Sequence, residues 1–155
     1  MAEIAKRRNE EENDGTDMMS SLPESVVCHI LSFLSIKTAV ATSLVSRRWR
    51  NLWKHRQVFQ FDDDYTYDYE RFKKFAFFVN AVLSLRTFRD IRKFRLHCGI
   101  MHEYKFPSNC INTWISAAIG PHLQELDLHI ANPYDTPNPI LPSSLLNCTN
   151  LVSLR

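Results

Sequence analysis

The chain has one set of neighbouring histidine and cysteine residues that could support chemistry. His97, Cys98, His102 and Cys110 lie close together in the sequence, and imidazole and thiolate are ligands that zinc favours. Their spacing fits no zinc module, and Cys98 would be buried beneath a strand that its neighbours predict. We therefore expect neither a metal site nor a cofactor.

Sequence motifs of enzymes are missing as well. The chain has three glycines, Gly15, Gly99 and Gly120, which are too scattered for a phosphate-binding loop. It has no G-x-S-x-G motif of the kind that presents a nucleophilic serine. We therefore expect a protein without catalytic residues, whose task is to bind other proteins.

The most informative segment lies near the N-terminus and predicts three short apolar helices. Pro23 suits a first helical position, where a missing N–H costs nothing. Further helices are predicted at 38–44 and 46–53, and Trp49 and Trp53 would share a face of the third. Three such helices bury too little surface to be stable alone, so we expect a partner. The apolar residues of the first helix follow Pro23 at helical spacing: Val26, Val27, Ile30, Leu31 and Leu34.

This segment resembles the F-box. Residues 22–34 read LPESVVCHILSFL, similar to the opening Leu-Pro helix of that family, and residues 43–53 read SLVSRRWRNLW, similar to its closing helix. Where the family often has Asp-Ala-Val, this chain has Thr-Ala-Val at 38–40. The resemblance covers residues 20–53 and implies docking onto the Skp-family adaptor of an SCF-type cullin–RING ubiquitin ligase.

The adaptor-binding residues that this resemblance and the helical spacing imply are apolar. The basic residues of the third predicted helix would steer it toward an acidic partner surface. The alternative for each apolar residue is a place in the internal core of the helices. The expected adaptor face consists of Leu22, Pro23, Val27, Ile30 and Leu34, with Val45 and Trp49 close to it or beneath it.

The next residues link this segment to the remainder of the chain. Residues 58–61 predict an edge strand or linker, and residues 62–69 predict an acidic loop. A helix is expected at 69–85, with an apolar stripe that is typical of a core-facing helix. The stripe consists of Phe72, Phe75, Val79, Val82 and Leu83.

A repeated apolar pattern follows. This L-x-x-L-x-L spacing is the signature of leucine-rich repeats, with a strand and a helix in each unit. It predicts parallel neighbouring strands at 91–96 and 123–128, with a helix at 109–119 crossing between them on the outer side. The copies begin 32 and 28 residues apart and are Ile91-x-x-Phe94-x-Leu96, Leu123-x-x-Leu126-x-Leu128 and Leu151-x-x-Leu154.

The two features together resemble the plant F-box/leucine-rich-repeat family, many of whose members end in an FBD domain. The resemblance covers residues 20–155 and implies that the strands hold a target protein. Side chains alternate along a strand, so those beside the apolar positions would face the target. In the family the repeats continue, whereas here the third copy stops within its strand, so we expect a truncated repeat region with loosely held residues 140–155. The expected target-binding residues are Arg95, His97, Asp127 and His129.

The predicted fold class is mixed, α+β to α/β. A three-helix F-box would be followed by the start of a leucine-rich-repeat strand–helix solenoid. The expected divisions are a disordered polar tail at 1–19, an F-box at 20–56, a linker strand and Phe-rich helix at 57–87, and incomplete repeats at 88–155.

Composition indicates an ordinary intracellular protein. The 155 residues are 45% hydrophobic and 23% charged, with a net charge of +2. The N-terminus lacks the apolar stretch of a secretion signal, and no apolar run reaches the length of a membrane span. The four cysteines form no C-x-x-C pair and are expected to be free thiols. We therefore expect a cytoplasmic or nuclear location.

The predicted function is that of a non-catalytic substrate-receptor subunit of an SCF-type ubiquitin ligase. It would bind the adaptor through the F-box and a target protein through the repeats. Two alternatives stay open. A truncated F-box protein could occupy the adaptor without presenting a substrate. The basic stretches at 37–56 and 71–95 could instead bind nucleic acid, although no groove-reading motif accompanies them.

Overall fold

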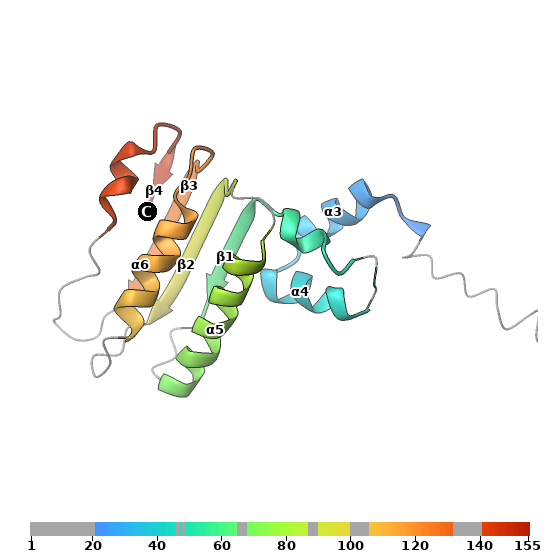
Figure 1. The fold of residues 1–155 in the computed structure, drawn as a ribbon, viewed down its shortest axis with the longest axis horizontal. Coiled ribbons are helices and arrows are strands. Elements are labelled where there is room, and N and C mark those ends of the chain that lie inside the picture. The colour runs from blue at the N-terminus through green and yellow to red at the C-terminus, as the bar shows by residue number, and fades with distance from the viewer. Residues whose placement is uncertain are drawn as a thin grey trace, which may run out of the picture.

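The structure is a computed structural model that describes residues 21–45, 47, 49–64, 68–86, 90–99, 106–131 and 141–155. Within these residues, two helices lie beside the first strand of a four-stranded parallel sheet (Figure 1). The predicted mixed class of helices and strands is confirmed. The predicted disordered tail at 1–19 lies outside the described residues.

Within the described residues, the first two helices are α3, Glu24–Phe33, and α4, Ile36–Val45. Pro23 precedes α3, and its carbonyl accepts the first helical hydrogen bonds, from the N–H groups of Val26 and Val27 at 3.0 and 3.1 Å. Ser35 separates the helices, and its hydroxyl accepts the N–H of Thr38 at 3.1 Å. This bond satisfies a backbone donor in the first turn of α4 that would otherwise have no partner.

The predicted third helix at 46–53 is not found. Residues 47 and 49–51 form turns, and a short 3₁₀ helix, η1, covers Leu52–His55. The backbone bonds here span three residues, as in Leu52 N–H to the Trp49 carbonyl at 3.1 Å. This tighter winding still buries both Trp49 and Trp53, each of which is 4% exposed. Residues 46 and 48 lie outside the described part of the chain.

The sheet is built from alternating strands and helices. Its strands are β1, Val58–Asp62, β2, Lys93–Gly99, β3, Glu125–Ala131, and β4, Ser153–Leu154, in that spatial order and all parallel. Helices α5, Tyr69–Leu85, and α6, Phe106–Ala118, and the 3₁₀ helix η2, Ser143–Asn147, connect them. The predicted parallel pairing of the second and third strands is confirmed, as is the edge position of β1.

Helix α5 has the bounds that its apolar stripe predicted. Asp68 stands at its N-cap, where its carboxylate accepts the N–H groups of Glu70 and Arg71 at 2.9 and 3.5 Å. The acidic segment before it is described only in part, because residues 65–67 lie outside the described ranges.

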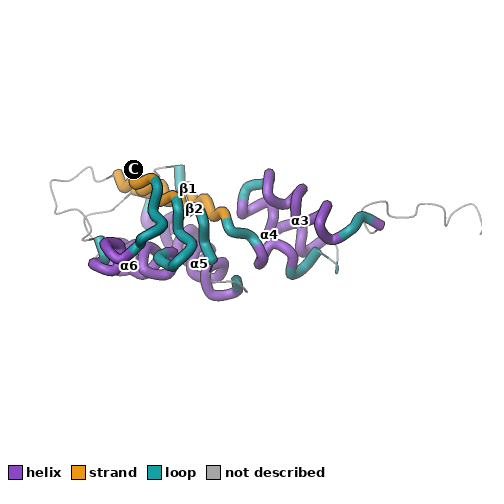
Figure 2. Tube along the Cα trace, turned by 90° about the horizontal axis from the view of Figure 1, so that it is seen from above, coloured by secondary structure: helices purple, strands orange, loops and turns teal. Residues whose placement is uncertain are grey.

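Both long connecting helices lie on one side of the sheet, and the opposite side carries no helix in the described chain (Figure 2). The covered side is filled by aromatic rings: Phe61 lies 5.8 Å from Phe94 and 6.2 Å from Phe78, centroid to centroid. Trp114 of α6 packs against Phe75 of α5 at 5.8 Å. Alternation along each strand therefore leaves polar side chains on the uncovered side, here called the open face.

Strands and helices alternate as a repeat protein requires. The leucine-rich-repeat solenoid itself and the predicted domain boundaries stay predictions.

Candidate protein-binding surfaces

Helix α3 presents an exposed apolar stripe. Val26 is 40% exposed and Phe33 is 77% exposed, and Ile30 between them is partly exposed. These residues are spaced by four and three positions, so they lie on one side of the helix. Leu22 and Pro23 extend the row at its N-terminal end, with Pro23 exposed and Leu22 partly exposed. We call these five residues the α3 stripe.

The other residues of the predicted adaptor face have different places. Val27 has no exposed surface and Trp49 is 4% exposed, so both support the helices from inside the core and offer no contact area of their own. Leu34 is partly buried beside the core. Val45 ends α4, and its side chain lies outside the description.

Two residues of this surface, Val26 and Phe33, were not part of the expected adaptor face. Val26 and Phe33 belong to the same apolar helix as Val27 and Leu34, and spacing alone did not show which pair would face inward. Helix α3 packs against η1, and Val27 and Leu31 are the residues of α3 with no exposed surface. No signal in the sequence separates the two pairs.

Arg56 holds the end of α3 in place. Its guanidinium Nη1 donates to the carbonyls of Leu31 and Leu34, both at 2.8 Å. Carbonyls in the last turn of a helix lack helical partners, and a cation there also favours the helix dipole. Burial lowers the pKa of the Arg56 guanidinium from its ordinary value. The position of Phe33 therefore depends on a residue that follows η1.

The second candidate surface is a polar cluster on the open face. The four predicted target-binding residues meet there in two neighbouring rows of β2 and β3, because the register pairs Arg95 with Asp127 and His97 with His129. Arg95 Nε donates to Asp127 Oδ2 at 2.8 Å, and His97 Nε2 lies 3.6 Å from the same oxygen. The rings of His97 and His129 lie 5.6 Å apart.

The cluster continues beyond these four residues. Lys93 Nζ lies 2.7 Å from Glu125 Oε1, and Asp62 Oδ2 lies 3.8 Å from His97 Nδ1. A groove of about 190 Å³ runs over the same strands and reaches Ser153 and Arg155. Lys93, Glu125 and Asp62 were not among the expected target-binding residues, although they stand at the same alternate positions of their strands. The open face is thus a set of paired charges, mostly exposed.

Of the cysteine and histidine group, the structure describes His97, Cys98 and Cys110, and the first two point to opposite sides of β2. Cys98 is fully buried on the covered side, whereas His97 points to the open face. Burial raises the pKa of the Cys98 thiol, and the charges of Asp63 and Asp62 raise it further. His102 lies outside the described residues. Among the residues that are described, no three His, Cys, Asp or Glu side chains are placed to hold a metal.

None of the helices in the described ranges has the length and apolar character needed to cross a membrane.

Comparison with known proteins places the first surface in a known domain. Residues 19–61 match the F-box domain. Over 143 residues the chain is 34% identical to F-box/LRR-repeat protein 13 of Arabidopsis thaliana, covering 92% of this chain and 31% of that protein. A putative F-box/FBD/LRR-repeat protein of the same plant is 37% identical over 147 residues, covering 90% of this chain and 27% of the relative.

The chain therefore spans about a third or less of these curated relatives, and 25% of another F-box/LRR-repeat protein of that plant, to which it is 38% identical. No solved structure matches the chain significantly. Residues 19–61 are thus an F-box domain, in a chain that is similar over nine tenths of its length to plant F-box/LRR-repeat proteins.

Proposed function

We propose that this chain is the substrate-receptor part of an SCF-type ubiquitin ligase. Its F-box would dock on a Skp-family adaptor, and its open face would hold a target protein. Other subunits would transfer ubiquitin, and the receptor would act by raising the effective concentration of the target. The observation that carries the proposal is the exposed apolar α3 stripe, which lies inside the matched F-box domain.

The α3 stripe has the properties of an interface anchor. Phe33 leaves 77% of its surface in water, and large apolar groups that are exposed together mark binding sites more often than isolated ones do. Buried support from Val27 and Leu31 fixes the helix beneath it. A rigid apolar row of this kind binds with little loss of side-chain entropy.

The test of adaptor docking compares two phenylalanines. Phe33 on α3 and Phe77 on α5 are each 77% exposed, so their truncation to Ala removes similar apolar surface. We expect Phe33→Ala to weaken binding of a purified Skp-family adaptor by about 2 kcal/mol, as for interface anchors. Leu22→Ala combined with Pro23→Ala should weaken it further. Phe77→Ala is the matched control and should bind as the unaltered chain does.

Equal losses of adaptor affinity in Phe33→Ala and Phe77→Ala would contradict docking through α3. Undiminished binding by the Leu22 and Pro23 double variant would contradict it as well.

Target binding through the open face rests on the cluster of Arg95, His97, Asp127 and His129. The charged side chains of this cluster pair with one another across the strands. A target protein with a complementary arrangement of charges could replace these pairs with ion pairs between the two proteins. The proposal predicts a protein that is captured by the chain and lost when the four residues are changed to Ala, while the adaptor is retained. Capture of the adaptor alone by both forms would favour the alternative of an F-box protein that occupies the adaptor.

A further inference from the structure

The F-box part of the chain has a large excess of positive charge. Residues 21–57 contain six lysines and arginines and one carboxylate, which gives a net charge of +5. The carboxylate is that of Glu24, in the first turn of α3. An excess of one sign attracts partners of the opposite charge. The six cations are Lys37, Arg47, Arg48, Arg50, Lys54 and Arg56.

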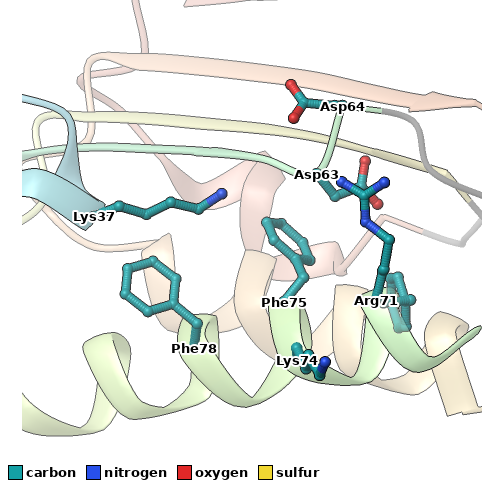
Figure 3. A pocket seen from close by; sticks show the side chains of 8 residues that line it. Lys37, Asp63, Asp64, Arg71, Lys74, Phe75 and Phe78 are labelled. Carbon is teal, nitrogen blue, oxygen red and sulfur yellow. The ribbon is translucent and has the colours of Figure 1, made fainter. Parts of the chain in front are cut away.

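Two of these cations have places of their own in the fold. Arg56 donates through Nη1 to the carbonyls of Leu31 and Leu34, both at 2.8 Å. Lys37 extends from α4 along helix α5, above the ring of Phe78 (Figure 3). There it lines a pocket of about 220 Å³ that also contains the carboxylates of two aspartates. Lys37 therefore faces α5 and not the turn that follows α4.

The other described cations lie around η1. Arg47 and Arg50 are exposed, and Lys54 is partly exposed. The N–H of Arg50 donates to the Arg47 carbonyl at 3.4 Å, so these two residues are one tight turn apart. The buried side of this segment consists of Trp49 and Trp53. Among the described residues, none of the three cations takes part in an ion pair. We call Arg47, Arg50 and Lys54 the η1 patch.

The segment directly before the F-box has the opposite charge. Residues 9–20 contain five carboxylates and neither lysine nor arginine, which gives a net charge of −5. We call these residues the acidic segment. It joins the described chain at Ser21, and the start of α3 lies at the end of the molecule away from the sheet, on the same side as the turn that follows α4 (Figure 1). The five carboxylates are those of Glu10, Glu11, Glu12, Asp14 and Asp17.

The acidic segment is long enough to reach the η1 patch. The eleven residues from Glu10 to Ser20 can span up to about 38 Å when extended. Helix α4, with ten residues, is only about 15 Å long. Covalent attachment also gives the segment an effective concentration of about millimolar, so weak ion pairs are enough to hold it.

We propose that the acidic segment lies against the η1 patch and neutralises the positive surface of the F-box. The charges that carry the inference are equal in number and opposite in sign, and they belong to neighbouring parts of one chain. An acidic partner would have to displace the segment before it could reach the patch. The inference is independent of adaptor docking, because it concerns the chain alone.

The test is zero-length carbodiimide cross-linking of the purified 155-residue chain, followed by peptide mass spectrometry. The reagent joins a lysine amine to a carboxylate that is in contact with it. We expect Lys54 to be joined to carboxylates of the acidic segment within the same chain. This product should be largely lost in about 1 M salt, where the screening length falls to about 3 Å. The positive controls are the ion pairs Lys73–Glu70 at 3.2 Å and Lys93–Glu125 at 2.7 Å.

Two triple variants, matched in the number of charges removed, identify the cause. One neutralises the three glutamates of the acidic segment and should lower the yield of the Lys54 cross-links to Asp14 and Asp17 severalfold. The other neutralises the three cations that precede the acidic segment and should not lower it. The variants are Glu10→Gln with Glu11→Gln and Glu12→Gln, and Lys6→Gln with Arg7→Gln and Arg8→Gln.

Three results would overturn the proposal. The first is the absence of cross-links between Lys54 and the acidic segment in a sample where both positive controls form. The second is an equal loss of yield in the two triple variants, which would show that the sign of the charge is irrelevant. The third is a covalent dimer as the main product of Lys54, which would assign the η1 patch to a second copy of the chain.

Discussion

Arg95 and Asp127 are 32 positions apart in the sequence and face each other across β2 and β3, with Nε of the arginine donating to Oδ2 of the aspartate at 2.8 Å. The same carboxylate lies 3.6 Å from His97 Nε2. One aspartate therefore links three strand positions that sequence spacing had placed on the same face. The repeat pattern contained this relationship, because equal offsets from Phe94 and Leu126 become equal positions in a parallel register.

The Arg95–Asp127 pair should contribute little to stability. The side chains are 48% and 24% exposed, so water and salt screen the attraction. A double-mutant cycle with Arg95→Ala and Asp127→Ala, followed by urea unfolding, should give a coupling energy below about 1 kcal/mol that shrinks in high salt. A coupling of several kcal/mol that is insensitive to salt would show that the pair is a structural element of the sheet.

The hydrogen bond between Trp114 and Asn80 should contribute measurably to the stability of the fold. Trp114 is 1% exposed, and its indole N–H donates to Asn80 Oδ1 at 2.7 Å between α6 and α5. Asn80→Ala leaves a buried donor without its partner, so we expect the free energy of unfolding to fall by about 1–2 kcal/mol. Ser84→Ala on the same helix is the control and should change little. An unchanged free energy of unfolding in Asn80→Ala would mean that water replaces the side-chain amide as the acceptor for Trp114.

Helix α5 and the strands could be predicted from the sequence, and the turn before η1 could not. The apolar stripe from Phe72 to Val82 recurs at helical spacing over about three turns, and Asp68 stands at the N-cap of the helix. In contrast, Trp49 and Trp53 are spaced for one helix face, yet both are buried by turns and a 3₁₀ helix. Over so short a segment, tertiary packing of two large rings outweighs local helix preference.

The two candidate binding surfaces also differ in how far the sequence predicts them. Alternation along a strand is strict, so the positions of Arg95, His97, Asp127 and His129 on one face could be predicted. The exposed side of α3 could not, because Val26 and Val27 are adjacent apolar residues of one helix. Only the packing of η1 against α3 decides which of them is buried.

Stability should fall at alkaline pH through Cys98. Its thiol is fully buried, and burial together with Asp63 and Asp62 raises its pKa. Because the folded state holds the proton more tightly than the unfolded state, the contribution of this group is complete below the ordinary thiol pKa of about 8.5 and declines as pH rises above it.

The free energy of unfolding should decline by up to about 1.4 kcal/mol for each pH unit. Urea unfolding at about pH 7 and about pH 9.5 measures it, and Cys98→Ala should reduce the slope between them. An unchanged slope in Cys98→Ala would assign the effect to other groups.

The pairing of β4 should be weaker than that of β2. Val152 N–H donates to the Gln124 carbonyl at 2.7 Å and Arg155 N–H to the Leu126 carbonyl at 3.0 Å, but Val152 is 83% exposed. Local opening is easiest where few apolar contacts hold the backbone. Amide hydrogen exchange should be faster at Val152 and Arg155 than at Leu96. Equal protection of these amides would contradict a loosely held end of the sheet.

The central claim is that α3 docks on a Skp-family adaptor, and the most direct measurement is amide hydrogen exchange of the chain with and without the purified adaptor. Binding should slow exchange in residues 22–34, which contain the α3 stripe, and leave the amides of β2 and α6 unchanged. The Phe33→Ala variant should lose that protection at the same adaptor concentration, and Phe77→Ala should keep it. Protection confined to α5 or the open face, with residues 22–34 unaffected, would contradict the account.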